Sequence, residues 1–108
     1  MRFGWVIGAF GLMTMAACGP IQATTGIIRA EEELRTAKLM EADRLAPYEY
    51  TKSDLMLKMA KERQGFSEFE AAKTFADEAL RYAVMAKQNV PRNIRQQMQK
   101  SPAAGGVR

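Results

Sequence analysis

The sequence contains no histidine and a single cysteine, Cys18. Without a second cysteine, no disulfide can form within the chain, and a metal site built from several cysteine or histidine ligands is excluded. A Ser-His-Asp or Cys-His catalytic arrangement is excluded as well, because its general base is missing. We therefore expect no metal, no cofactor and no catalytic residue.

Proline is also scarce, with four residues among 108, and aromatic residues make up 8%. Hydrophobic residues, many of them alanine and methionine, account for 47%, and charged residues for 26%, which is typical of a globular chain. The few β-branched residues favour helix over sheet. A chain of this length forms at most one domain. The composition predicts a small all-α domain.

Acidic residues are absent after Glu78, although the net charge of the whole chain is only +4. The cations beyond that point include Arg92, Arg95 and Lys100. Such a basic end suits contact with anionic lipid, cell-wall carboxylates or an acidic partner, and it equally suits a solvated tail. We predict a basic, mostly disordered tail over residues 91–108, with these three side chains as possible anionic contacts.

The N-terminal segment has Arg2 followed by an uncharged, largely apolar run from Phe3 to Ala17. About 15 residues is the length of a signal peptide and falls short of the roughly 20 that span a membrane. The run ends in Met15-Ala16-Ala17-Cys18-Gly19, which resembles the lipobox of bacterial lipoproteins, with Met15 in the place of the usual leucine. An ordinary secretory signal, cleaved after Ala17, is the alternative.

The lipobox resemblance implies cleavage between Ala17 and Cys18, with a diacylglycerol on the Cys18 thiol and a further acyl chain, such as palmitate, on the new amine. Two or three acyl chains hold a protein stably on a membrane, whereas one is marginal. Gly19 replaces the aspartate that retains such proteins in the inner membrane. We therefore expect an outer-membrane lipoprotein facing the periplasm. An exported chain rarely meets nucleic acid, and the sequence has no basic stripe interleaved with aromatic residues, so we expect no binding to nucleic acid.

Three helices are expected in the mature chain. The first covers about 22–45 with a buried stripe at Ile27, Ala30, Leu34 and Ala37, and Pro47 ends or kinks it. The second runs from about 48–52 to 64, with Gly65 as its C′ residue. Its apolar side is expected to hold Tyr48, Leu55, Met56 and Met59.

The third helix starts at a capping box, Ser67-x-x-Glu70, and closes at Asn89 and Pro91. Its heptad seam consists of Phe69 followed by Ala72, Ala76, Ala79, Ala83 and Ala86. We thus expect an antiparallel three-helix hairpin or bundle after a cleaved signal peptide. Its parts are a signal peptide (1–17), a lipidated cysteine with its tether (18–26), a helical domain (27–90) and the basic tail.

Ala46-Pro47-Tyr48, Leu55, Gly65-Phe66 and the repeated alanines make residues 20–90 resemble short, alanine-rich bacterial lipoproteins with an uncharacterised helical domain. In relatives of that group, a similar domain precedes an OmpA-like domain. The resemblance implies the Gram-negative envelope and brings no catalytic residues with it. It also implies that Tyr48 belongs to the core, whereas Tyr50 remains open as an exposed recognition residue.

Each buried alanine removes little apolar surface from water, so an alanine seam stabilises a bundle weakly. We therefore expect an envelope protein partner or self-association. The expected function is that of a non-enzymatic structural or adaptor subunit of the cell envelope. The alternative is a small periplasmic binding module that recognises cell-wall glycan or anionic lipid through its basic C-terminal end.

Overall fold

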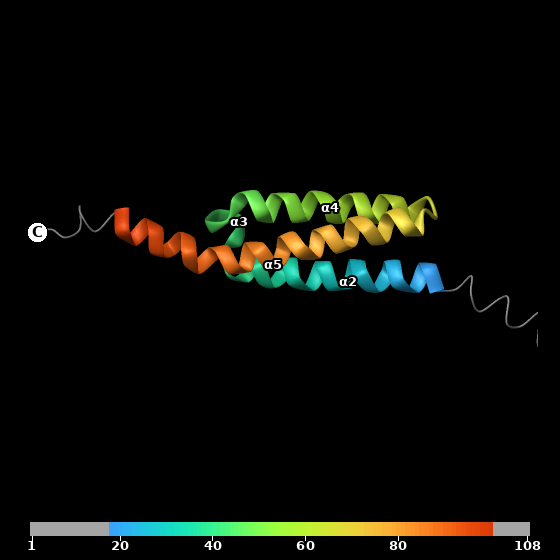
Figure 1. Ribbon diagram of the computed structural model, residues 1–108, viewed down its shortest axis with the longest axis horizontal. Helices are drawn as coiled ribbons and strands as arrows, with labels where there is room; N and C mark the ends of the chain where they lie inside the picture. Colours follow the sequence, from blue (N-terminus) through green and yellow to red (C-terminus); the bar gives the residue numbers. More distant parts are fainter. Residues whose placement is uncertain (1–17, 101–108) are drawn as a thin grey trace, which may run out of the picture.

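The computed structural model describes residues 18–100, which form helices joined by short turns and contain no strand. This confirms the all-α class. Among these residues, no helix is both long enough and apolar enough to cross a membrane. The helices are α2 (Cys18–Leu39), α3 (Ala42–Leu45), α4 (Pro47–Gly65) and α5 (Phe69–Lys100) (Figure 1).

The three long helices lie side by side, and α5 packs against both α2 and α4 (Figure 1). Helices α2 and α5 run in the same direction, since Gly26 lies against Ala76 and Glu33 pairs with Lys87 at 2.7 Å. Helix α4 runs against both of them (Figure 1). The short α3 sits at the end of the bundle where α2 gives way to α4.

The first expected helix is in fact two helices. Helix α2 begins at Cys18, so residues 18–26 are helical where we expected a tether. It ends at Leu39, and Glu41 then takes a left-handed φ of 62° before α3 begins. The second of them, α3, ends at Leu45, so the expected end of this segment just before Pro47 is confirmed. Pro47 itself occupies the first turn of α4, where its missing N–H costs nothing.

The turn between α4 and α5 differs from the expected capping box, because Ser67 belongs to the C-terminal cap of α4 and does not start α5. Ser67 has a left-handed φ of 61°, and its N–H donates to the carbonyl of Gln64 at 3.0 Å. The Glu68 N–H donates to the carbonyl of Arg63 at 2.9 Å. This pair of bonds is a Schellman motif with Ser67 at C′. Gly65, expected at C′, is the last residue of the helix and has no positive φ.

The buried seam confirms the expected alanine pattern. Fully buried positions on α5 follow a heptad spacing, and the stripe on α2 meets them. On α4 the buried face differs from the expected one, since Leu55 is half exposed and Tyr48 is 65% exposed, whereas Tyr50 packs on the core. The core side of α4 is built from Tyr50, Ser53, Leu57 and Ala60, and Met56, which was expected on this face, also packs against the core.

Small residues decide which side of α4 faces α5. Ser53 is fully buried, and its hydroxyl donates to the Ala79 carbonyl at 2.6 Å. A serine that satisfies its hydroxyl across the seam can replace an alanine there at little cost. A count of large apolar residues does not register this, which is why the sequence-based face was wrong at Tyr48 and Leu55.

Helix α5 continues through Pro91 to Lys100, so it does not close at Asn89 and Pro91, and residues 91–100 are helical. In Figure 1 its final orange-to-red stretch leaves the other helices and turns in a new direction. Proline inside a helix removes one backbone bond and commonly bends the axis. We call residues 91–100 the α5 overhang. The remainder of the expected tail, residues 101–108, lies outside the described residues.

Candidate functional site

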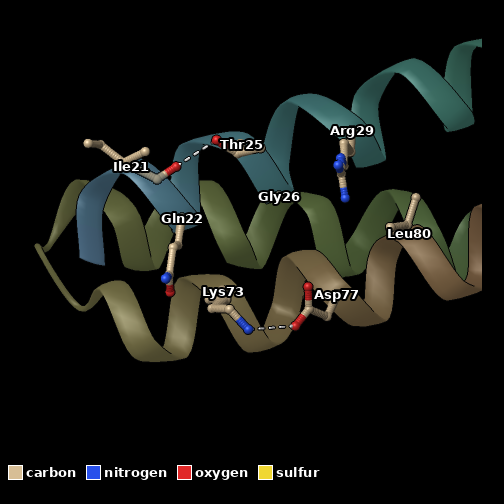
Figure 2. Close-up of a pocket in the computed structure, with 8 residues that line it drawn as sticks. All are labelled: Ile21, Gln22, Thr25, Gly26, Arg29, Lys73, Asp77 and Leu80. Carbon is tan, nitrogen blue, oxygen red and sulfur yellow. Dashed lines mark hydrogen bonds and ion pairs between the residues drawn. The ribbon is translucent and has the colours of Figure 1, made fainter. Parts of the chain in front are cut away.

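A groove of about 360 Å³ runs between α2 and the first half of α5. Figure 2 shows Gln22 and Arg29 pointing from α2 toward α5, and Asp77 and Leu80 pointing from α5 toward α2. The groove is lined by Ile21, Gln22, Thr25, Gly26, Arg29, Lys73, Asp77 and Leu80.

Close helix contact forms the bottom of this groove. A Cβ added at Gly26 would lie 3.2 Å from the Ala76 Cβ, so α2 and α5 meet there almost backbone to backbone. Lys73 and Asp77 pair with each other at 3.2 Å, while Arg29 makes no ion pair within residues 18–100. The groove therefore offers one guanidinium beside apolar side chains, which suits a weak contact with a single anionic group.

An aromatic patch lies on the other side of α5, where the Tyr48 and Tyr82 rings meet edge to face at 6.5 Å. The Arg81 guanidinium lies 4.8 Å from the centre of the Tyr82 ring, and the Lys52 Nζ lies 5.9 Å from it. A hydrogen bond to Glu78, together with its charge, raises the pKa of Arg81. An apolar hollow of about 380 Å³ adjoins this patch, lined by Pro47, Tyr48, Thr51, Lys52 and Leu55.

The basic residues singled out from the sequence all lie on the α5 overhang. Arg92, Arg95 and Lys100 are exposed there. Ile94 and Met98, which are 39% and 64% exposed, occupy another side of the same helix. At about 100° per residue, Arg92 points roughly 160° away from Ile94, so the overhang is amphipathic. The only hydrogen bond recorded from the overhang's side chains to the bundle runs from Asn93 to the Leu45 carbonyl, at 2.6 Å.

Cys18, the expected lipidation site, is the first residue of α2, and Ala17 lies outside the described residues. A Cβ on the next residue, Gly19, would lie 3.6 Å from the Phe69 Cβ, so Cys18 sits beside the start of α5. From Phe69 to Lys100 the helix rises by about 46 Å, at roughly 1.5 Å per residue. The structure therefore does not bring Cys18 and the basic residues together but holds them at opposite ends of the molecule.

The outward side of α2 is an exposed apolar surface that was not predicted from the sequence. Ile21, Ile28 and Leu39 are 63%, 48% and 81% exposed there. The seven-residue spacing of the two isoleucines, out of step with the buried stripe, was the available signal. In the described part of the chain, no group of three His, Cys, Asp or Glu residues could hold a metal ion.

No protein-family model, curated protein or solved structure matches the chain. Function is therefore inferred from its residues and their geometry.

Proposed function

We propose that this protein is a non-enzymatic lipoprotein of the cell envelope, held by lipid on Cys18 and acting as a structural or adaptor subunit in the periplasm. The observation that carries the proposal is the lipobox-like Met15-Ala16-Ala17-Cys18, which leads directly into α2. A helix that begins at the modified cysteine leaves no linker between the lipid and the folded body. Because Gly19 follows Cys18 in place of the aspartate that retains such lipoproteins in the inner membrane, we expect the lipid anchor to lie in the outer membrane.

The helical body suits an adaptor because it is narrow and because its core provides little stability of its own. An antiparallel three-helix hairpin formed by α2, α4 and α5 is joined mainly through alanines, which contribute less hydrophobic stabilisation than larger side chains. Exposed apolar side chains remain on all three of these helices, among them Ile28, Leu55 and Met98. A partner or a second copy would cover some of this surface. The resemblance to alanine-rich envelope lipoproteins agrees with this role.

Replacement of Cys18 tests the anchor. In bacteria fed radiolabelled palmitate, we expect the native chain to be labelled and to sediment with membranes. The Cys18→Ser chain should take up no label and should not be processed at that position, because a hydroxyl is a poor nucleophile for this alkylation. Thr25→Ser, an exposed conservative change on the same helix, is the matched control. A processed Cys18→Ser chain that stays on the membrane would overturn the anchor.

Chemical crosslinking in intact envelopes, followed by purification of the native chain, tests the adaptor role. We expect a discrete crosslinked species of higher mass that disappears when the membranes are solubilised before crosslinking. A chain that remains strictly monomeric in the envelope contradicts the adaptor role while leaving the lipid anchor standing.

A second candidate function rests on the α5 overhang, whose cations extend beyond the bundle. This is a small binding module for cell-wall glycan or anionic lipid through Arg92, Arg95 and Lys100. It predicts salt-sensitive sedimentation with isolated cell walls or phosphatidylglycerol vesicles, lost when the three residues become Gln. Changing Arg44, Lys58 and Lys73 to Gln removes equal charge elsewhere and should leave sedimentation intact. Equal loss in both triple variants counts against this function.

A further inference from the structure

Helix α2 carries apolar residues on two opposite faces, although packing into the bundle requires only one apolar face. Its inner face is the stripe that packs into the bundle, from Ala23 to Ala37. On its outer face, Ile21, Ile28 and Leu39 are exposed. Figure 2 shows the Ile21 side chain pointing away from α5, while Gln22 points toward it. We call the row formed by Ile21, Ile28, Arg35 and Leu39 the α2 outer face.

Spacing confirms that this row is one surface. Ile21, Ile28 and Arg35 follow one another at seven residues and Leu39 at four more, so at about 100° per residue they stay within roughly 40° of each other. The row extends over about 27 Å, from the first turn of α2 to its last residue. It therefore runs along the long axis of the bundle.

Two of the three consecutive acidic residues of α2 pair with lysines of the other helices. Glu31 pairs with Lys61 of α4, and Glu33 pairs with Lys87 of α5 at 2.7 Å, so both carboxylates are neutralised by other helices. Of the three consecutive acids, only Glu32 is exposed without an ion pair within residues 18–100.

The cations of α2 are exposed along its length. They are Arg29, Arg35 and Lys38, and none of them forms an ion pair within the described residues. Arg29 lies on the flank of the row beside α5, Lys38 lies on the flank beside α4, and Arg35 lies within the row. The exposed Glu32 lies within about 20° of Ile21, so the outward side and its flanks carry three cations and one acid. Apolar rows flanked by cations are characteristic of helices that lie in the interface of a membrane with anionic lipids.

We propose that the α2 outer face lies lengthwise on a bilayer containing anionic phospholipid, so that the whole bundle rests on its side against the membrane. This inference rests on the proposed function, since the lipid on Cys18 would supply the tether. Cys18 precedes Ile21 by less than one turn, so an anchored chain already holds one end of the row at the lipid surface. Tethering raises the local concentration of the remaining contacts, so a few apolar residues suffice.

A second copy fits this surface less well than a bilayer. The footprint of α2 is about 330 Å², from a length of about 33 Å and a width of about 10 Å. A stable protein interface buries about 800 Å² on each partner. A bilayer does not meet this objection, because the anchor supplies most of the attachment and anionic headgroups match the excess of cations.

Depth-dependent fluorescence quenching tests the orientation. The full chain, processed by the bacterium and bearing its native Cys18, is reconstituted into vesicles of equal amounts of phosphatidylcholine and phosphatidylglycerol. A small fluorescent amino acid is incorporated singly at position 21, 28 or 39. The control is position 55, since Leu55 is 50% exposed and lies on α4. Quenching is measured with bromine on the lipid acyl chains, and circular dichroism verifies the helical content of each variant.

We expect strong and similar quenching at positions 21, 28 and 39, within about twofold, because an interfacial helix sits at one depth along its length. Position 55 should be quenched little. Quenching that falls steadily from 21 to 39 would mean that the bundle stands upright on its anchor, and it overturns the proposal. Equal quenching at 55, or quenching at none of the four positions, overturns it too.

Mass spectrometry of the acyl groups on Cys18, measured on the same preparation, separates the two proposals. An acylated chain with graded quenching leaves the lipoprotein function intact and refutes the orientation. A chain without acyl groups refutes the anchor, and the four labels then report whether α2 meets the vesicle without one.

Discussion

Ser67 occupies the most strained backbone position in the turn between α4 and α5. Its φ of 61° belongs to the left-handed region, where a Cβ costs roughly 1 kcal/mol and glycine costs almost nothing. Gly65, two residues earlier, is helical, and a Cβ there would meet nothing within 4 Å. The glycine therefore lies at position 65, whereas the left-handed conformation that favours glycine occurs at position 67.

Ser67→Gly should raise the free energy of unfolding by about 0.5–1 kcal/mol, because it relieves the left-handed strain. Chemical denaturation monitored by circular dichroism measures the change. Ser67→Ala keeps the Cβ and should give no gain. A destabilised Ser67→Gly variant would show that this residue does not adopt the left-handed conformation.

Gly65→Ala should also stabilise the protein, by about 0.4–1 kcal/mol, since alanine suits a helical residue in open space. If Gly65 were the C′ residue expected from the sequence, the same change would destabilise the chain. The sign of the shift in the denaturation midpoint decides between the two. Loss of stability would refute the Schellman geometry described above.

Ala76→Leu should destabilise the bundle by about 1–3 kcal/mol, because the seam has no room for a larger side chain beside Gly26. Thr74→Leu places the same side chain on an exposed position of α5 and should change the unfolding free energy by no more than about 0.5 kcal/mol. Thermal melting of the two variants side by side measures the difference. Equal melting temperatures would mean that the seam is loosely packed.

At the scale of the residue, the sequence predicted the buried alanines but not the roles of Ser53 and Ser67. Alanines at heptad spacing have one physical interpretation, a close helix contact, and the structure bears it out. Ser67 was expected to cap the start of α5 and Ser53 was not singled out, whereas the structure places Ser67 in the C-terminal cap of α4 and Ser53 in the buried seam. Each role depends on a bond to a residue elsewhere in the fold, the Ala79 carbonyl for Ser53 and the Gln64 carbonyl for the Ser67 N–H. Local pattern carries no information about such partners.

At the scale of the element, α5 is notable for continuing through Pro91. The preceding turns are fixed by the buried seam up to Val90, which packs with Leu45 and Ala46. Asn93 then bonds to the Leu45 carbonyl at 2.6 Å. These contacts lie on both sides of the proline, so tertiary packing supports a helix that local propensity would end. The sequence pattern predicted the break because it weighed the propensity alone.

Pro91→Ala should strengthen the α5 overhang, because it restores a backbone hydrogen bond and removes a ring clash worth up to about 3 kcal/mol in a helix interior. We expect slower amide hydrogen exchange over residues 92–97 and more helix by circular dichroism. Gln96→Ala, an exposed change within the overhang, should have a much smaller effect. Faster exchange after Pro91→Ala would contradict a continuous helix through residue 91.

Of the candidate sites on α2 and α5, only part could be predicted from the sequence. The basic character of residues 91–100 followed directly from composition. Their amphipathic arrangement did not, because it exists only if the segment is helical. The α2 outer face was missed for another reason, since the exposed Ile28 adjoins the buried Ile27 in sequence, and the seven-residue spacing that links Ile28 to Ile21 was overlooked beside the stronger buried stripe.

At the scale of the whole molecule, the folded core and the overhang are nearly independent. Most of the overhang's residues are exposed, and Asn93 supplies its recorded side-chain bond to the bundle. The two clusters that hold α2, α3, α4 and α5 together end at Val90. Changes beyond residue 92 should therefore alter what the protein touches more than whether it folds.

Ending the chain after Pro91 should lower the free energy of unfolding by no more than about 1 kcal/mol, the usual value of one hydrogen bond. Ending it after Leu80 removes Ala83, Ala86 and Val90 from the core and should prevent cooperative unfolding altogether. Calorimetry of the two truncated chains makes the comparison. Loss of cooperative melting in the longer one would mean that the overhang is part of the core.

The parallel course of α2 and α5 has a mechanical consequence. If Cys18 is fixed to a membrane and a partner pulls on the overhang, the two forces act at opposite ends of neighbouring helices. The load is then a shear along the seam, in which many small contacts must fail together, and not a peeling force that breaks them singly. A bundle that melts easily could thus still resist stretching, since forced unfolding depends on the barrier and the direction of pull and not on equilibrium stability.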